Sequence, residues 1–148
     1  MSREFEEIKT KVIRANHAAW NEGELDALDE IYSPDLVRHE PPFPEKPDLA
    51  TYKQWIADSR VSYPDAKLNI DEMIIVGDKV ASKWTFTGTH SGSHTALPIP
   101  PSNKFVEMKG ASFAHMEGGL MTEEWIYGDY TGLFQQIGVI PAFEAEDT

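Results

Sequence analysis

The sequence predicts a single α+β domain in which helices come first and a curved antiparallel sheet follows. Three observations carry this prediction. Apolar residues recur at helical spacing in the N-terminal region, alternate with polar residues from Ala66 onward, and return to helical spacing between Thr131 and Ile137. The chain has 148 residues without repeats or low-complexity tracts, a length that one domain, residues 1–148, accounts for.

The composition limits the possible functions. Asp and Glu number 25 against 13 Lys and Arg, a formal net charge of −12, which repels nucleic-acid phosphates and anionic lipid. The absence of cysteine excludes disulfides, thiolate catalysis and cysteine-based zinc sites. No apolar run reaches the roughly 18 residues of a membrane helix, and the acidic N-terminus has no apolar signal core. We therefore expect a cytoplasmic protein that binds neither nucleic acid nor membranes.

Three helices are predicted ahead of the sheet. An apolar stripe from Phe5 to Ala19 indicates the first helix, and Gly23 is a natural left-handed residue to end it. A second, short helix is expected over residues 25–32. Asp48 can cap the third helix, and Pro64 ends it.

Strand patterns dominate the rest of the chain. A brief strand over Asp35–Glu40 runs into the stiff proline-rich loop 41–47. The long loop 89–103 is of a kind that often forms lids or binding segments, and the acidic tail, residues 143–148, is expected to fray. The main strands are predicted over residues 66–76, 79–87, 105–116 and 121–129.

The last strand places a carboxylate among aromatic residues. At a period of two, Trp125 and Tyr127 share a face with Asp129, which stands where the strand meets the terminal helix. Partial desolvation there would raise the pKa of Asp129 toward the range useful for proton transfer. Alternatively, Asp129 caps the helix by accepting backbone N–H groups near Gly132, which would lower its pKa. The sequence leaves both interpretations open.

Segment 123–138 reads Glu-Glu-Trp-Ile-Tyr-Gly-Asp-Tyr-Thr-Gly-Leu-Phe-Gln-Gln-Ile-Gly. This segment resembles the C-terminal signature of the SnoaL-like polyketide cyclases and ester cyclases. Segments 20–28 and 88–92 match further motifs of these proteins, which belong to the nuclear transport factor 2-like superfamily. The resemblance implies a cone-shaped fold in which three N-terminal helices pack on a curved, mostly antiparallel sheet around one pocket. It also implies acid–base catalysis without a cofactor, with Asp129 as the acid and base.

The resemblance further implies which residues surround Asp129. His39 precedes two prolines as in the family, and His90 lies in the matching loop motif, so both are expected to assist catalysis. Without the resemblance, His39 would be interpreted as a surface or capping histidine. Tyr127 could donate a hydrogen bond to an enolate or pack in the core. The expected substrate-binding residues are Tyr127, Trp125, Trp84, Phe86 and Trp55.

We therefore expect a lyase- or isomerase-type enzyme that acts on a small apolar carbonyl compound by aldol cyclisation, isomerisation or dehydration. Asp129→Asn should keep the fold and abolish turnover. The alternative is a non-catalytic module that binds a small molecule in the same cavity. No metal is expected, because His90 and His94 lie in a loop without a ligand in register. A homodimer through the outer face of the sheet is also expected.

Overall fold

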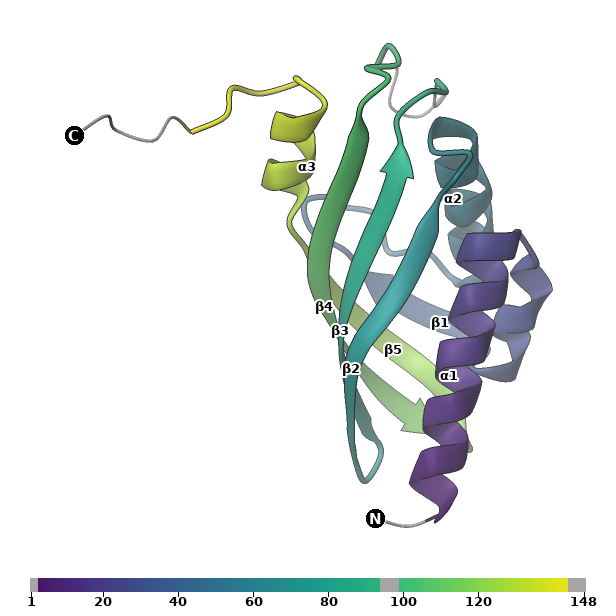
Figure 1. Cartoon of the computed structure of the whole chain (residues 1–148). Coiled ribbons are helices and arrows are strands. Elements are labelled where there is room, and N and C mark those ends of the chain that lie inside the picture. The colour runs from purple at the N-terminus through teal and green to yellow at the C-terminus, as the bar shows by residue number, and fades with distance from the viewer. Residues whose placement is uncertain (1–2, 94–98, 144–148) are drawn as a thin grey trace.

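A computed structural model of the chain describes residues 3–93 and 99–143. The fold is α+β, as predicted, with a five-stranded sheet in the order β1-β5-β4-β3-β2 (Figure 1). The elements are α1 (Arg3–Glu22), the 3-10 helix η1 (Leu25–Glu30), β1 (Tyr32–His39), α2 (Leu49–Ser62), β2 (Lys67–Val76), β3 (Lys79–Thr89), β4 (Phe105–Glu117), β5 (Leu120–Gly128) and α3 (Tyr130–Gln136).

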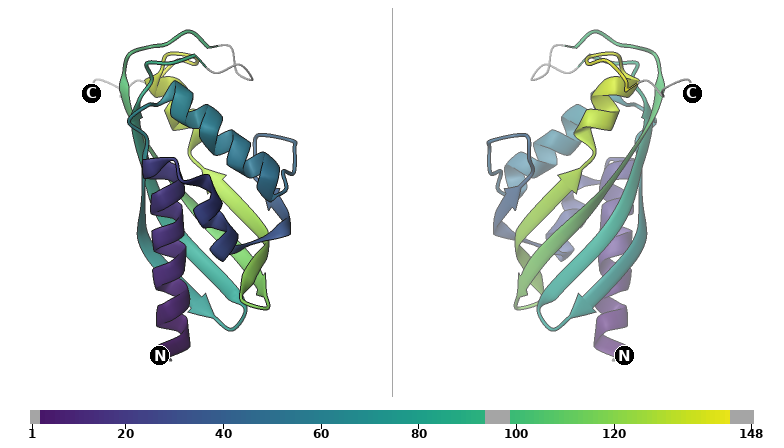
Figure 2. Two further views of the ribbon diagram at one scale, coloured as in Figure 1. Left: turned by 90° about the vertical axis from the view of Figure 1, so that its right-hand side faces the viewer. Right: turned by 90° about the vertical axis from the view of Figure 1, so that its left-hand side faces the viewer.

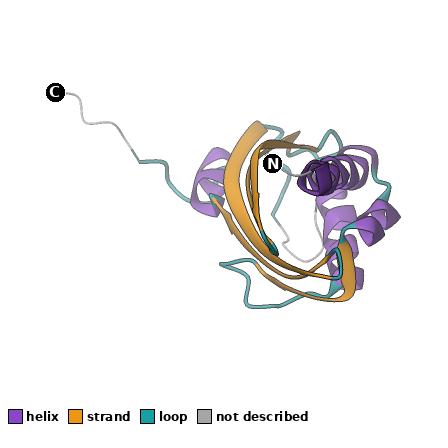
Figure 3. Ribbon diagram, turned by 90° about the horizontal axis from the view of Figure 1, so that it is seen from below, coloured by secondary structure: helices purple, strands orange, loops and turns teal. Residues whose placement is uncertain are grey.

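The helices cover one face of the sheet and leave the other face bare (Figure 2). Viewed from below, the sheet curls around an interior that the helices close on the open side (Figure 3). The terminal helix α3 extends from the end of β5 and packs against β4. The curl and α3 together create the enclosed space in which a pocket can form. Within the described residues, no helix is long and apolar enough to cross a membrane.

The helix boundaries largely follow the sequence signals. Gly23, with φ +76°, follows α1 directly, as a left-handed ending residue should. The side chain of Asp48 accepts the backbone N–H of Thr51 at 2.9 Å and begins α2. The prediction of three α-helices before the sheet needs one correction, because the middle helix is the short 3-10 helix η1. Tyr32, assigned to that helix from the sequence, begins a strand instead.

Strand β1 is longer than predicted and lies at the edge of the sheet. It pairs in parallel with β5 alone, whereas the other neighbouring strands are antiparallel. Pro34 lies inside β1, a position that an edge strand tolerates because one side of its backbone needs no ladder partner. The strand therefore begins at Tyr32 rather than at Asp35 and carries alternate side chains into the interior.

A β-bulge near the start of β5 changes which residues face the interior. Met116 pairs with Met121, but His115 pairs with Glu123, so Thr122 is an extra residue without an opposite partner. A one-residue insertion moves every later side chain to the other face of the sheet.

Unbroken alternation from Met121 would place Trp125 and Tyr127 on the same face as Met121, but the bulge turns both to the outer face, which corrects their predicted inward orientation. Met121 is buried, while Tyr127 is 58% exposed on the outer face. The buried positions after the bulge belong instead to Glu124 and Ile126.

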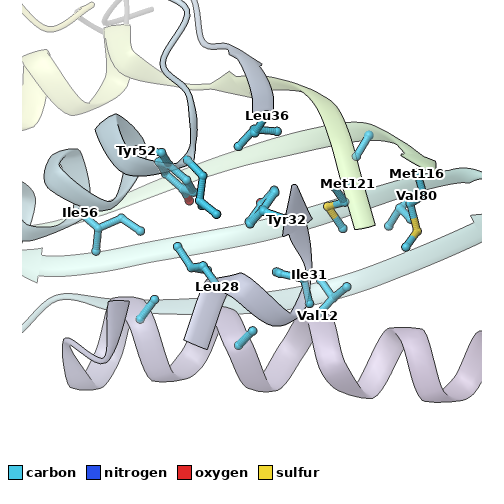
Figure 4. Packing of buried hydrophobic residues seen from close by; sticks show 14 of the residues in the cluster. Val12, Leu28, Ile31, Tyr32, Leu36, Tyr52, Ile56, Val80, Met116 and Met121 are labelled. Carbon is cyan, nitrogen blue, oxygen red and sulfur yellow. The ribbon is translucent and has the colours of Figure 1, made fainter. Parts of the chain in front are cut away.

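Two apolar clusters form the core. In the first, Leu28, Tyr32 and Tyr52 come together from η1, β1 and α2 above residues of the sheet (Figure 4). The second gathers Trp84, Phe86 and other sheet residues against the apolar face of α3. Trp20 packs against both clusters. The interior is thus filled at two places, with the end of α1 between them.

Candidate functional site

A cavity of about 370 Å³ is lined by residues of α2, α3 and the inner face of the sheet. Its size and its largely apolar wall are typical of sites for small organic molecules. The aliphatic wall residues are Ile99, Met108, Leu133 and Ile137. The aromatic wall residues are Trp20, Phe43, Tyr52, Trp55, Tyr63, Phe86, Tyr130 and Phe134.

A smaller chamber of about 80 Å³ adjoins this cavity and extends toward α1 and the first core cluster. Four polar residues line both spaces, and therefore stand where the two meet: Arg38, Glu40, Tyr52 and Tyr130. We refer to these four residues together with Tyr32 and Glu124 as the buried polar cluster.

Arg38 is the centre of the buried polar cluster. Leu36, Arg38 and Glu40 alternate with more exposed residues, so β1 and the residue after it direct all three side chains inward. Nη1 of Arg38 is paired with Oε1 of Glu40, and its Nε donates to Oε1 of Glu124 at 3.3 Å. The guanidinium carbon lies 3.8 Å from the centre of the Tyr52 ring, a cation–π contact.

Tyrosine hydroxyl groups complete the hydrogen bonding of both carboxylates. The hydroxyl of Tyr32 donates to Oε1 of Glu124 at 2.8 Å, and the hydroxyl of Tyr130 donates to Oε2 of Glu40. The hydroxyl of Tyr52 accepts the indole N–H of Trp20 at 3.2 Å, so its own proton can still be donated to a ligand. The cluster therefore presents the carboxylate of Glu40 and the phenolic donor of Tyr52 at the edge of the apolar cavity, while Glu124 lies in the smaller chamber.

One guanidinium faces two carboxylates here, and the charges are shielded from water. Burial raises the pKa of Glu124, although Arg38 and the hydrogen bond from Tyr32 act in the opposite direction. Burial raises the pKa of Tyr52 to about 12, and burial together with Glu40 raises the pKa of Tyr130 well above its ordinary value. The tyrosines thus stay protonated, and burial favours the protonated form of Glu124.

His90 lines the same cavity from the end of β3. The residue is 4% exposed, and burial lowers the pKa of its imidazole. Its ring packs against Tyr63 at 5.3 Å between ring centres, and its Nδ1 accepts the backbone N–H of Ser102 at 3.1 Å. These contacts hold the ring in one orientation.

Asp129, the predicted acid and base, lines neither of these two spaces. It is exposed, and its Oδ1 accepts the backbone N–H of Gly132 at 2.8 Å, which makes it the N-cap of α3. The geometry is that of the capping alternative. Its neighbour Tyr130 points into the cavity instead.

Three further predicted site residues lie on the outer face of the sheet, which corrects their expected place in the pocket. Trp125 and Tyr127 face outward because of the bulge at Thr122. His39 alternates with the inward-facing Arg38; it stacks on Trp125 with 5.2 Å between ring centres, and its Nε2 lies 2.7 Å from Glu123 Oε2.

The remaining predicted residues do line the interior. Trp55 and Phe86 contribute to the large cavity, and His90 joins them there. Trp84 lines the small chamber, where its indole N–H donates to Oγ of Ser112 at 2.9 Å. The structure therefore brings part of the predicted set into the interior, where the carboxylates are Glu40 and Glu124 rather than the predicted Asp129.

The sequence reasoning missed the buried polar cluster. The signal for Arg38 and Glu40 is their alternation with Leu36 in the predicted strand Asp35–Glu40, but no local pattern marks this face of the strand as the inner one. Glu124 could be recognised only by locating the bulge. Within residues 3–93 and 99–143, no group of three or more His, Asp or Glu side chains is arranged to hold a metal ion. His94, considered above as a metal ligand, lies outside the described residues.

Comparison with solved structures shows where this fold recurs. A candidate polyketide cyclase from Acidithiobacillus ferrooxidans is 28% identical, with a TM-score of 0.77 over 94% of this chain and 99% of the other. TsrD from Streptomyces laurentii is 25% identical, with a TM-score of 0.77 over 95% and 99%. AclR, a candidate hydroxylase from Streptomyces galilaeus, is 22% identical, with a TM-score of 0.78 over 93% and 85%.

A search of curated proteins finds no match. The model of the SnoaL-like polyketide cyclases matches residues 10–137, which is most of the chain. The matched segment includes most of α1, all of α2 and α3, and all five strands. The chain therefore belongs to the SnoaL-like polyketide cyclase family.

Proposed function

We propose that this protein is a cofactor-independent acid–base enzyme that acts on a small, largely apolar carbonyl compound. One observation carries the proposal: two carboxylates share a single buried guanidinium where an apolar cavity meets a smaller chamber. Such a cluster can accept and return one proton without leaving an isolated charge in the interior. Aldol cyclisation, isomerisation and dehydration all need this proton transfer.

Glu40 is the proposed base, because it lines both spaces whereas Glu124 lines only the small chamber. Glu40 removes a proton from the carbon next to the ligand carbonyl, and the electron pair of that C–H bond moves toward the carbonyl oxygen. The hydroxyl of Tyr52 donates a hydrogen bond to the enolate oxygen that develops. Arg38 and Tyr130 hold Glu40 in place, and Glu40 then returns the proton to product.

The aromatic wall supports this chemistry by keeping water away from the reacting atoms. Hydrogen bonds and ion pairs act more strongly in a site of low dielectric, so the donor of Tyr52 stabilises an enolate better there than in water. The wall also selects flat, apolar ligands that can pack against its rings.

Deuterium exchange tests the proposal without knowledge of the natural substrate. The protein is mixed in D2O with 1-tetralone, an aromatic ketone with exchangeable protons beside its carbonyl, and the loss of their NMR signal is followed. Wild-type protein should accelerate the exchange, and Glu40→Gln should lose the acceleration. Exchange at the rate of buffer alone would leave the second candidate, a module that binds a small molecule without catalysis, which the same cavity supports.

We also propose that the outer face of the sheet pairs with a second copy of the chain. Val37, Phe113 and Tyr127 are exposed there beside Trp125, and apolar side chains that are exposed close together can mark a subunit contact. Phe113→Glu should convert a dimer to a monomer in sedimentation, because it would bury a charge in the contact. A wild-type monomer at micromolar concentration would contradict the proposal.

A further inference from the structure

We propose that Ser62 and His90 form a second polar subsite in the large cavity, which binds a neutral carbonyl oxygen of an otherwise apolar ligand. The inference rests on the proposed function only in that the cavity holds a small apolar molecule, and it does not require catalysis. Both residues line the cavity. They come from the end of α2 and the end of β3.

Ser62 supplies the first observation. The residue is 4% exposed, and its buried Oγ has no hydrogen-bond partner among the described residues. A buried hydroxyl without a partner destabilises a protein, so native structures contain few of them and each has a reason. Rotation of the Ser62 side chain toward the cavity that the residue lines would give the hydroxyl a ligand oxygen as its missing partner.

His90 supplies the second observation. Its Nδ1 accepts the N–H of Ser102, and a ring nitrogen that accepts a hydrogen bond carries no proton. The neutral ring therefore carries its proton on Nε2. The lowered pKa of the buried ring keeps this neutral form at physiological pH. Among the described residues, the hydrogen bonds of this ring go to Ser102 through Nδ1, which leaves the Nε2 proton for a ligand.

The backbone ties the two residues into one assembly. The N–H groups of Ser91 and Gly92 donate to the carbonyl oxygen of Ser62 at 3.2 and 3.1 Å. The segment that follows His90 is thus fixed to the end of α2, and the neighbouring Tyr63 packs on the imidazole. Two donors on one rigid support can bind a single acceptor without loss of their own freedom.

This subsite is separate from the buried polar cluster. His39 lies between Arg38 and Glu40 and pairs with Trp125 on β5. Trp125 pairs with Phe113 on β4, and Phe113 pairs with Ala81 on β3. His90 follows nine positions after Ala81 in the chain, near the far end of the same strand. A ligand that reaches both places must therefore carry polar atoms at two separate positions, and a compound with a single carbonyl group occupies only one of them at a time.

The charges of the cavity decide which oxygen acceptor fits. Arg38 is already paired with two carboxylates. Beyond the cluster and His90, the residues of the described lining that carry a charge at neutral pH are Glu45 and Asp58, both acidic. A ligand carboxylate would be repelled by these groups and by the net charge of −12. A ketone or quinone oxygen is uncharged, so it avoids this repulsion and can accept hydrogen bonds from both Ser62 and His90.

Equilibrium binding of 1-tetralone and tetralin, which differ by one carbonyl group, tests the subsite. Binding is followed by tryptophan fluorescence, since Trp20 and Trp55 line the cavity. Ser62→Ala should weaken 1-tetralone binding by about 3- to 10-fold and leave tetralin binding unchanged. The change in the ratio of the two affinities isolates the contact with the carbonyl.

Two substitutions of His90 provide a matched comparison. Asparagine can replace the acceptor Nδ1 but has no group where Nε2 lies, whereas glutamine can place an N–H donor near Nε2. His90→Asn should lose the carbonyl preference that His90→Gln keeps in part. Urea unfolding of Ser62→Ala should show no loss of stability, because the variant removes an unpartnered hydroxyl.

Three results would overturn the subsite: equal losses for both compounds, no loss for 1-tetralone, or no binding of either compound. The test is also separable from the proposed catalysis. The substitutions could lower the affinity for 1-tetralone as predicted while the wild-type protein fails to accelerate deuterium exchange. That combination would support the subsite and contradict only the proposed enzymatic function.

Discussion

The hydroxyl of Tyr130, the first residue of α3, donates a hydrogen bond to Glu40, ninety positions earlier in the chain. This bond joins the terminal helix to the residue that follows β1. It also places a helix that forms part of the cavity wall against the carboxylate proposed as the base. A change at either residue should therefore affect both the stability of the fold and the reactivity of the site.

Tyr130→Phe tests the structural half of this relationship. The variant keeps the ring but leaves one oxygen of buried Glu40 without its donor, which should lower the free energy of unfolding by about 1–3 kcal/mol. Urea unfolding measures the change. Tyr127→Phe is the matched control, since that exposed hydroxyl should matter by less than about 0.5 kcal/mol. Equal effects of the two substitutions would contradict the assigned role of the Tyr130 hydroxyl.

Glu124→Gln should show how much the buried, ionised carboxylate of Glu124 lowers the free energy of unfolding. The pKa of Glu124 is raised above its ordinary value of 4.5, so ionisation is less favourable in the folded than in the unfolded chain. Glu124 therefore lowers the stability of the wild type as the pH rises from about 4.5 through the folded pKa. Gln keeps an acceptor for Tyr32 and cannot ionise.

The stability of Glu124→Gln relative to wild type should consequently increase between about pH 4 and about pH 7. Urea unfolding of both proteins across this range gives the difference. Glu117→Gln, at an exposed position, should show no such trend. A relative stability of Glu124→Gln that stays constant or falls with pH would show that the folded pKa of Glu124 is not raised.

Gly92→Ala should disturb the support of His90. A Cβ atom at this position would lie 1.8 Å from the carbonyl oxygen of Val61, so the segment must move away from α2. We expect a loss of about 1–3 kcal/mol in stability and a weaker preference for 1-tetralone over tetralin. Gly77→Ala is the control: it has open space at φ +59° and should cost about 1 kcal/mol without changing ligand binding.

The sequence predicted the elements better than it predicted the site. Local signals, such as the cap at Asp48 and Gly23 after α1, lie within a few residues of the boundaries they set, so they can be recognised without the rest of the fold. The 3-10 helix η1 was harder to identify because its apolar spacing also fits a short α-helix. Residues 144–148, most of the tail expected to fray, lie outside the described residues.

The face of β5 could not be predicted because it depends on a long-range pairing. Thr122 is an ordinary strand residue in the sequence, and only the register with β4 shows that it is the extra residue of a bulge. A regular alternation that ignores the bulge at Thr122 predicts that Trp125 and Tyr127 face the pocket and that Glu124 faces away from it. Pairing of Arg38 with Glu124 across 86 positions is likewise set by the sheet alone.

The measurement that tests the central claim most directly compares Glu40→Gln with Asp129→Asn in the deuterium-exchange assay. Asparagine caps a helix about as well as aspartate, so Asp129→Asn should keep α3 in place and retain an exchange rate within about twofold of wild type. Glu40→Gln should lower the rate by about 100-fold or more, because the proton acceptor is gone. Normal exchange by Glu40→Gln together with an inactive Asp129→Asn would contradict the account and assign the proton transfer to Asp129.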